Sequence, residues 1–223
     1  MIDHDCIMRI ESIQVGKPKT LASDWTSAIF KQQVVGTVAL NKLNLEGDQQ
    51  ADLSVHGGVD KAVNVYPIEH YQYWNQRARF PLRKRINLPT PNNGAFGENF
   101  TTSGLLESNV CIGDIYQVGS VLVQISQPRQ PCWKLARKFN QAKLPFWVQN
   151  TSKTGWYFRV LQEGNVQSND EFTLIERMNP SWTIQRANQL MYSVDKNQQD
   201  IHSLLECKEL SDSWRKTFNN FIK

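Results

Sequence analysis

The stretch IYQVGSVLVQI, residues 115–125, decides the fold class of this chain. Two runs rich in β-branched and aromatic residues flank the turn Gly119-Ser120. Glycine permits the backbone of a two-residue turn, so the stretch predicts a β-hairpin. It is the clearest of several short β segments between about residues 6 and 173.

Other β segments lie on both sides of this hairpin. The remaining runs that predict strands are residues 6–15, 36–40, 156–161 and 172–175, with a turn at 163–165 between the last two. In residues 6–15 apolar and polar positions alternate, and Gly16-Lys17-Pro18 ends the run. Short strands at regular spacing with few helices predict a closed β-barrel or a sandwich, so the fold class is mainly β.

Two short helices are expected as insertions among the strands. The helix expected over residues 67–79 has apolar side chains at helical spacing, namely Tyr71, Trp74 and Ala78. Pro67 suits its first turn, where no backbone N–H is needed. Residues 132–139 follow Pro131 directly and form the second candidate helix.

The pattern changes after about residue 178. Three segments carry apolar side chains at helical spacing and predict short amphipathic helices. Their apolar residues are Ile184, Ala187, Leu190, Met191 and Val194; Ile201, Leu204 and Leu205; and Trp214, Phe218 and Phe221. A three-helix unit must bury such stripes, so we expect core packing and not a partner groove. The expected organisation is a β domain over residues 1–178, with its motifs between 47 and 175, and a three-helix domain over residues 179–223.

Composition excludes several classes of protein. The 223 residues are 40% hydrophobic, which is enough for a packed core and argues against intrinsic disorder. The net charge of +4 is modest, so no nucleic-acid polymer is expected as a partner. No stretch reaches the ~18 apolar residues that span a bilayer, and residues 1–6 lack the order of a signal peptide, which predicts a cytoplasmic protein without a membrane partner. The four cysteines form no CxxC pair and are expected to be free thiols.

Among these thiols, Cys132 has the sequence surroundings of a reactive one. Pro128 and Pro131 stiffen the chain before it. If Pro131 opens a helix, Cys132 lies in the first helical turn, where backbone N–H groups and the helix dipole favour a thiolate. Arg129 and Lys134 add positive charge nearby. Such a thiolate could attack a substrate or bind a soft metal ion, and a buried structural cysteine is the alternative. The other three cysteines are expected to be unreactive.

A second group of residues predicts an anion site. His56-Gly57-Gly58 is followed by Lys61, and adjacent glycines let the backbone approach a ligand closely. Their N–H groups could form an anion seat together with Lys61. This is not the GxxxxGK[ST] phosphate loop. His56 either contacts the ligand or satisfies backbone groups, and both interpretations stay open.

Two further segments could contribute to the same site. In the segment GAFGEN, residues 94–99, glycines surround Asn99, whose amide offers a donor and an acceptor to a heterocycle edge. Arg159 lies on the opposite face of a predicted strand from Trp156 and Phe158, so it could meet a phosphate or remain a solvated charge. At a barrel mouth these motifs could converge on an anionic ligand with a sulfur-binding centre.

At these residues the chain resembles the MOSC family, which is named after the C-terminal part of molybdenum cofactor sulfurase. The motifs that carry the resemblance are HGGVDKAV at 56–63, FGEN at 96–99 and QPRQPC at 127–132. The helical tail from about Pro180 is similar to that of the YiiM-type subgroup, known as 6-N-hydroxylaminopurine resistance proteins. The resemblance covers nearly the whole chain and implies a MOSC-type β-barrel followed by a three-helix domain.

The resemblance implies a pterin-type molybdenum cofactor in this barrel. Cys132 is then the molybdenum ligand and the catalytic residue. The residues implied to bind the phosphate or the pterin edges of the cofactor are His56, Gly57, Gly58, Lys61, Asn99, Arg129 and Arg159. The family name also carries an association with pyridoxal phosphate binding.

The implied activity is the reduction of N-hydroxylated compounds, such as hydroxylaminopurine base analogues, to amines, which detoxifies them. The partners are then a small N-hydroxylated substrate and an external electron-donating reductase of the flavoprotein type, because no clustered cysteines could hold an electron carrier. Two other functions stay open: a carrier that binds the molybdenum cofactor without turnover, and a thiol enzyme with Cys132 as nucleophile and His56 as base. The oligomeric state also stays open, with a homodimer as one form.

Overall fold

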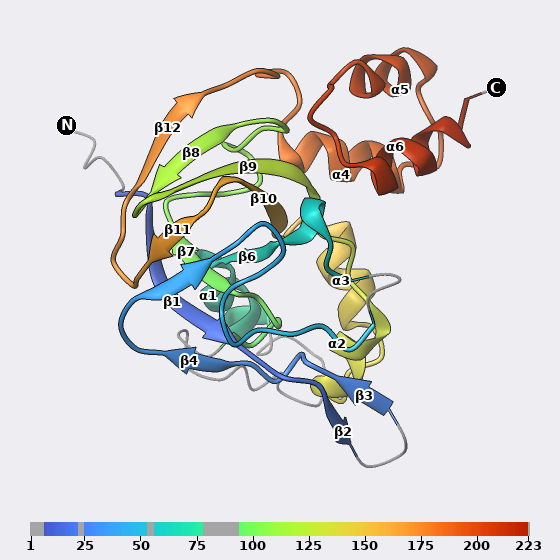
Figure 1. Ribbon diagram of the computed structural model, residues 1–223. Coiled ribbons are helices and arrows are strands. Elements are labelled where there is room, and N and C mark those ends of the chain that lie inside the picture. Colours follow the sequence, from blue (N-terminus) through green and yellow to red (C-terminus); the bar gives the residue numbers. More distant parts are fainter. Residues whose placement is uncertain (1–6, 22–24, 53–55, 78–93, 223) are drawn as a thin grey trace, which may run out of the picture.

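The computed structural model describes residues 7–21, 25–52, 56–77 and 94–222, and its centre is an eight-stranded sheet (Figure 1). The strands, in spatial order, are β12 (Phe172–Glu176), β8 (Ile115–Val118), β9 (Val121–Pro128), β10 (Trp156–Gln162), β6 (Val63–Pro67), β7 (Phe100–Ser103), β1 (Arg9–Val15) and β4 (Gln32–Val34). β6 and β7 pair in parallel, and the other neighbours pair antiparallel. The predicted mainly β class is confirmed.

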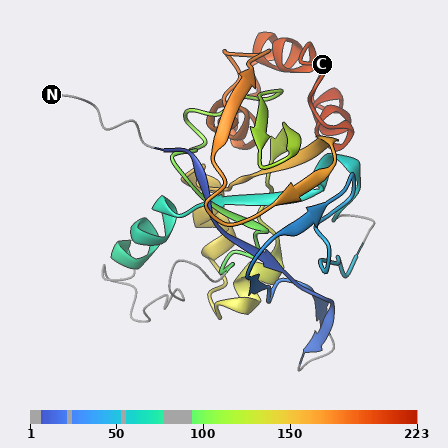
Figure 2. The ribbon, with the colours of Figure 1, turned by 60° about the vertical axis from the view of Figure 1, so that its left-hand side comes forward.

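The sheet curls (Figure 2). Its hydrogen-bonded ladders do not close into a barrel. β12 and β4 are the two ends of the strand order. The segment at the start of β1 meets the start of β12 and the chain just before it through a few backbone hydrogen bonds. Ile10 N–H donates to Asp170 O at 2.9 Å, Asn169 N–H donates to Ile10 O at 2.7 Å, and Phe172 N–H donates to Met8 O at 2.8 Å. Because these bonds and one isolated bridge replace a continuous ladder, the predicted closed barrel is not confirmed in the described residues.

The predicted hairpin is present. β8 and β9 pair in the register Val118↔Val121, and Gly119 has the positive φ of 54° that the turn requires. Two small ladders add the remaining strands, β2 (Lys19–Leu21) with β3 (Trp25–Ser27) and β5 (Val38–Leu40) with β11 (Gly164–Val166). The expected strands at 6–15, 36–40, 156–161 and 172–175 therefore all correspond to observed strands, although Cys6 lies outside the described residues.

Two details of the chain path differ from expectation. Gly164 and Asn165, expected in a turn, begin β11, because pairing with β5 gives them ladder partners. Pro67 ends β6 and does not open the helix; α1 (Glu69–Arg77) begins two residues later, and residues 78–79 of the expected helix are not described. β6 was not expected as a strand, and all five of its residues, including the polar Asn64, are buried.

The helices fall into two groups. Near the sheet lie the short turn η1 (Val59–Lys61), α1, α2 (Trp133–Lys138) and α3 (Leu144–Asn150). The three predicted C-terminal helices are α4 (Ile184–Tyr192), α5 (Gln198–Leu205) and α6 (Asp212–Asn219). Their N-termini are capped by side-chain oxygens of Thr183, Asn197 and Ser211, which accept otherwise unpaired backbone N–H groups. None of the helices in the described part of the chain combines the length and the apolar character needed to span a lipid bilayer.

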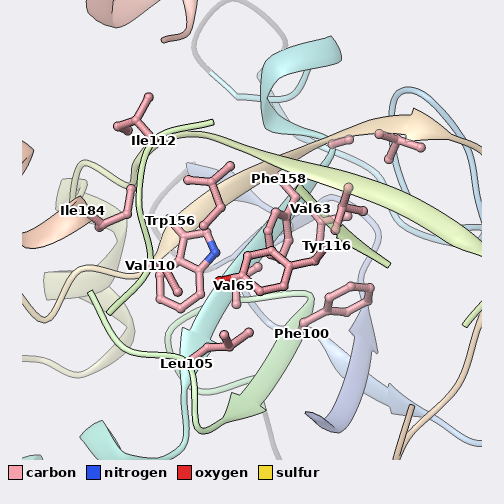
Figure 3. Packing of buried hydrophobic residues seen from close by; sticks show 14 of the residues in the cluster. Val63, Val65, Phe100, Leu105, Val110, Ile112, Tyr116, Trp156, Phe158 and Ile184 are labelled. Carbon is pink, nitrogen blue, oxygen red and sulfur yellow. The ribbon is translucent and has the colours of Figure 1, made fainter. Parts of the chain in front are cut away.

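One hydrophobic cluster joins the sheet to the C-terminal helices. Figure 3 shows Trp156, Phe158 and Tyr116 of the sheet packed near Val110 and Ile112, with Ile184 of α4 beside them. The apolar side chains of α5 and α6, including Leu204 and Phe218, belong to the same cluster. The stripes are thus core, as expected, except that Val194 lies beyond α4 and is 96% exposed. The division into two domains stays a prediction.

Candidate functional site

A cavity of about 660 Å³, counting the space at its open mouth, brings together most of the predicted site residues. His56, Gly57, Lys61, Asn99, Arg129 and Cys132 line it, although they lie in three separate segments of the chain. Gly58 and Arg159 are not among the lining residues. The ends of β9 and the loops before β6 and β7 converge here, which explains why residues distant in sequence meet.

Cys132 lies at the start of α2 but not inside its first turn. The helix begins at Trp133, and Cys132 is the extended N-cap residue, with φ of −105° and ψ of 164°. Proline at 131 therefore sets the entry to the helix and does not open it. Cys132 is partly exposed and lines the cavity, whereas Cys111 and Cys207 are buried. Burial raises the pKa of both buried thiols, that of Cys207 to about 11, which disfavours a reactive thiolate at either position.

Arg129 brings an unsatisfied donor to the cavity wall. Its residue is 5% exposed, and its Nη2 donates to the carbonyl oxygen of Phe96 at 2.7 Å. Its Nη1 is buried and has no hydrogen-bond partner among the described residues. A buried guanidinium nitrogen without an acceptor is costly, and this atom could donate a hydrogen bond to an anionic ligand in the cavity.

His56 is held in its neutral form. Burial lowers its pKa to about 4, and the positive charges of Lys134, Arg129 and Lys61 act in the same direction. A neutral imidazole can both donate and accept a hydrogen bond at physiological pH. The clustered cations make the cavity electropositive on the side of His56.

The turn at Gly57 and Gly58 has a left-handed backbone, which favours glycine. Their φ angles are 83° and 85°, and Lys61 N–H donates to Gly58 O at 2.9 Å to close η1. A Cβ on Gly57 would lie 3.1 Å from Oε1 of Gln50, so glycine also leaves room for the neighbouring chain. Burial lowers the pKa of Lys61, and Asp60 opposes that shift.

Asn99 is engaged within the protein. Its Oδ1 accepts Asn64 N–H at 3.1 Å, and its Nδ2 donates to Gln14 O at 3.2 Å and to Asp48 Oδ2 at 2.9 Å. The buried Asp48 also accepts Gly16 N–H at 2.8 Å. The Asn99 side chain thus fixes Asp48 in the wall, and its predicted contact with a heterocycle stays a prediction.

Lys31 is a cavity residue that was not predicted from the sequence. Its Nζ donates to Asp48 in an ion pair whose two side chains are 7% and 1% exposed. Burial lowers the pKa of Lys31, and Asp48 counteracts the shift. No sequence signal marks Lys31, because it lies in an irregular segment between β3 and β4.

Arg159 lies away from the cavity lining. Its Nε and Nη2 donate to Oδ1 of Asp60 at 3.0 and 2.7 Å, and its Nη1 donates to Oε1 of Gln124 at 3.1 Å. The guanidinium is therefore occupied by protein acceptors. Its predicted contact with a phosphate stays a prediction.

The cavity offers one sulfur ligand and no preformed metal cluster. Among the described residues, no group of three or more His, Cys, Asp and Glu side chains has a metal-binding arrangement. Cys132 and His56 line the same cavity, but no hydrogen bond between them is present in the described chain. A metal held here would need further ligands from outside the protein.

Comparison with known proteins gives two family matches. The MOSC domain model matches residues 52–173, and the model of the YiiM-like, 3-alpha helix domain matches residues 182–220. The first covers the cavity motifs and the second covers α4 to α6.

Curated relatives resemble the chain over most of its length. It is 45% identical over 210 residues to the uncharacterized protein YflK of Bacillus subtilis. This match covers 93% of this chain and 91% of YflK. It is 40% identical to protein YiiM of Escherichia coli, over 94% of this chain and 87% of that protein. A protein of Gibberella moniliformis named reductase is 36% identical over 87% of this chain, which corresponds to 33% of that longer protein.

A solved structure has the same architecture. The crystal structure of YiiM from Geobacillus stearothermophilus matches with a TM-score of 0.78 and 40% identity, covering 97% of this chain and 100% of that one.

Proposed function

The chain belongs to the MOSC domain family and carries the YiiM-like three-helix domain, and on this premise we propose that it is a molybdenum-cofactor-dependent reductase. Its substrates are N-hydroxylated compounds, such as hydroxylaminopurine base analogues, which it converts to amines. MOSC domains are associated with the molybdenum cofactor at the level of the family, and one relative is named a reductase. Both points support an oxidoreductase without fixing its substrate.

The observation that carries the proposal is the meeting of Cys132 and Arg129 in one cavity. The cofactor combines a soft metal with an anionic phosphate, so its site needs a sulfur ligand and cations. The partly exposed Cys132 thiol supplies the first requirement. The buried, unpartnered Nη1 of Arg129 supplies the second, and Lys61 adds a further positive charge. The residues present therefore fit this group.

Each residue has a proposed role in the bound state. Cys132 holds the metal through Sγ, and Arg129, Lys61 and the backbone of Gly57 hold the phosphate. Neutral His56 orients the pterin or phosphate edge by hydrogen bonding. The buried Lys31–Asp48 pair and Asn99 keep their part of the cavity wall in place.

The reaction consumes two electrons and two protons: R–NHOH + 2 e⁻ + 2 H⁺ gives R–NH₂ + H₂O. When bound, the cofactor supplies the oxygen-accepting and electron-transferring centre. The protein holds the N–O group near that centre, and the open mouth of the cavity lets water deliver protons. The electrons come from an external reductase, for which we propose a flavoprotein.

Metal analysis tests the assignment of Cys132. Protein made in cells that synthesise the molybdenum cofactor should contain molybdenum, and Cys132→Ala should lose it. Cys207→Ala is the matched control, because this variant removes a buried thiol that belongs to the C-terminal core. Molybdenum at full occupancy in Cys132→Ala would refute the assignment.

Turnover separates the proposal from the two other functions. With 6-hydroxylaminopurine as substrate and a dithionite-reduced dye as electron donor, we expect formation of adenine that depends on bound molybdenum. Bound cofactor without turnover would instead identify a carrier. Conversion by metal-free protein that requires both Cys132 and His56 would identify a thiol enzyme.

A further inference from the structure

Asp60 joins the glycine turn of the cavity to the C-terminal helices. It lies in η1, between Gly58 and the cavity residue Lys61. Its Oδ1 accepts Nε and Nη2 of Arg159 at 3.0 and 2.7 Å, and its Oδ2 accepts the backbone N–H of Asp212 at 3.2 Å. Asp212 is the first residue of α6, so one carboxylate bonds the turn to β10 and to the tail.

A second set of hydrogen bonds fixes α6 to the end of β9. Ser126 Oγ donates to the carbonyl oxygen of Asp60 at 2.5 Å, and Ser211 N–H donates to Ser126 O at 3.0 Å. Ser213 Oγ donates to Oε1 of Gln127 at 2.9 Å. The turn, the end of β9 and the start of α6 therefore form one bonded unit.

The start of α6 is itself firmly held. Ser211 caps the helix by accepting Trp214 N–H at 3.3 Å. Trp214 and Phe218 are 1% and 0% exposed and belong to the core shared with the sheet. A helix anchored in this way can restrain the turn that is bonded to its first residues.

We propose that Asp60 is a positioning residue that fastens the turn of residues 57–61 to α6, so that the C-terminal helices support the cavity. Arg159 acts with Asp60, because its guanidinium is bonded to Asp60 and Gln124. The fastening is independent of any ligand. That the fastened turn helps to bind an anion at Lys61 rests on the proposed function.

Hydrogen exchange of the full-length protein tests the fastening. The peptide that covers residues 56–62 should exchange about tenfold faster in Asp60→Ala, because hydrogen bonds to a partly buried charge are lost. Ser213→Ala, which removes one bond of the same unit, should give a smaller increase. Asp200→Ala is the matched control: it also removes a carboxylate from an arginine, with Arg186 Nη2 at 2.8 Å from Asp200 Oδ1, but within the tail. The control should exchange at the wild-type rate at residues 56–62.

Two results would overturn the proposal. One is unchanged exchange at residues 56–62 in Asp60→Ala; the other is a uniform increase over the whole chain, which would show only a loss of global stability. If Asp60→Ala does not fold, Ser213→Ala is used in its place. Its exchange rate at residues 56–62 is then compared with the wild-type rate and with the rate over the rest of the chain.

Binding of inorganic phosphate, measured by calorimetry, separates this proposal from the proposed function. We expect wild-type protein to bind phosphate and Asp60→Ala to bind it about three- to tenfold more weakly. If the wild-type protein and Asp60→Ala bind phosphate with equal affinity, the fastened turn does not support the anion site. If the wild-type protein does not bind phosphate, this result counts against the anion site of the proposed function. The hydrogen-exchange experiment at residues 56–62 still tests whether Asp60 fastens the turn to α6.

Discussion

Truncating Phe218 should destabilise the whole protein and not the tail alone. Phe218 is 0% exposed and packs against Trp214, with ring centroids 5.6 Å apart. Both side chains belong to the cluster that also contains the sheet residues Trp156 and Phe158. Phe218→Ala leaves a cavity in this shared core, so one cooperative unit should lose stability.

The expected loss follows from the size of the removed side chain. A buried Phe→Ala change costs about 3–5 kcal/mol through lost burial and the cavity left behind. For a chain of this length each kcal/mol lowers Tm by about 2–4 °C, so the expected decrease is about 6–20 °C. Scanning calorimetry measures it, and urea unfolding gives the free energy independently.

Val194→Ala is the control, because Val194 is 96% exposed just beyond α4. It should change the free energy of unfolding by less than ~0.5 kcal/mol. The reasoning would be refuted if Phe218→Ala split the calorimetric trace into a tail transition at low temperature and a sheet transition at the wild-type Tm. In that case the three helices would fold as an independent domain.

Two further predictions concern the cavity and its surroundings. The pKa of His56 should lie near 4, as measured by NMR titration of its ring protons, and its neutral form should contribute stability that is lost as pH falls from about 6.5, the value in an unfolded chain, towards 4. Lys61→Met should raise this pKa, since the charge of Lys61 lowers it; a wild-type midpoint near 6.5 would contradict the burial argument. Gly155→Ala should cost at least ~3 kcal/mol, because φ is 71° and the new Cβ would lie 2.1 Å from Val65 O. Gly36→Ala is the control, because φ is 91° and no atom lies within 4 Å of the new Cβ; it should cost only ~1–2 kcal/mol. If urea unfolding shows equal losses of stability for the two variants, the contact between the Cβ at position 155 and Val65 O adds no cost and this prediction is wrong.

Local patterns predicted much of the secondary structure. The hairpin at 115–125 is readable because its strands and its glycine turn are adjacent in sequence. The three C-terminal helices are readable because each carries its own apolar stripe and a capping residue. β6 was not predicted because its five residues are too short a run to identify a strand by pattern, and its ladder partners β7 and β10 are distant in sequence.

Other features depend on partners that are distant in the chain. The strand role of Gly164 comes from pairing with β5, which lies more than a hundred residues earlier. Whether the sheet closes depends on how β1 contacts the chain around the start of β12. These two segments are about 160 residues apart, so no local sequence pattern predicts their contact.

The sequence by itself determined the residue types of the candidate site: a cysteine between charged neighbours, a glycine pair followed by a lysine, and a glycine-flanked Asn99. Tertiary structure decided which of them share a cavity. It placed Cys132, Arg129 and His56 around one cavity, added Lys31 to the lining, and paired Arg159 with Asp60. The physical reason is that residue type limits what a side chain can bind, whereas long-range strand pairing and core packing set which side chains meet and which charges already have partners.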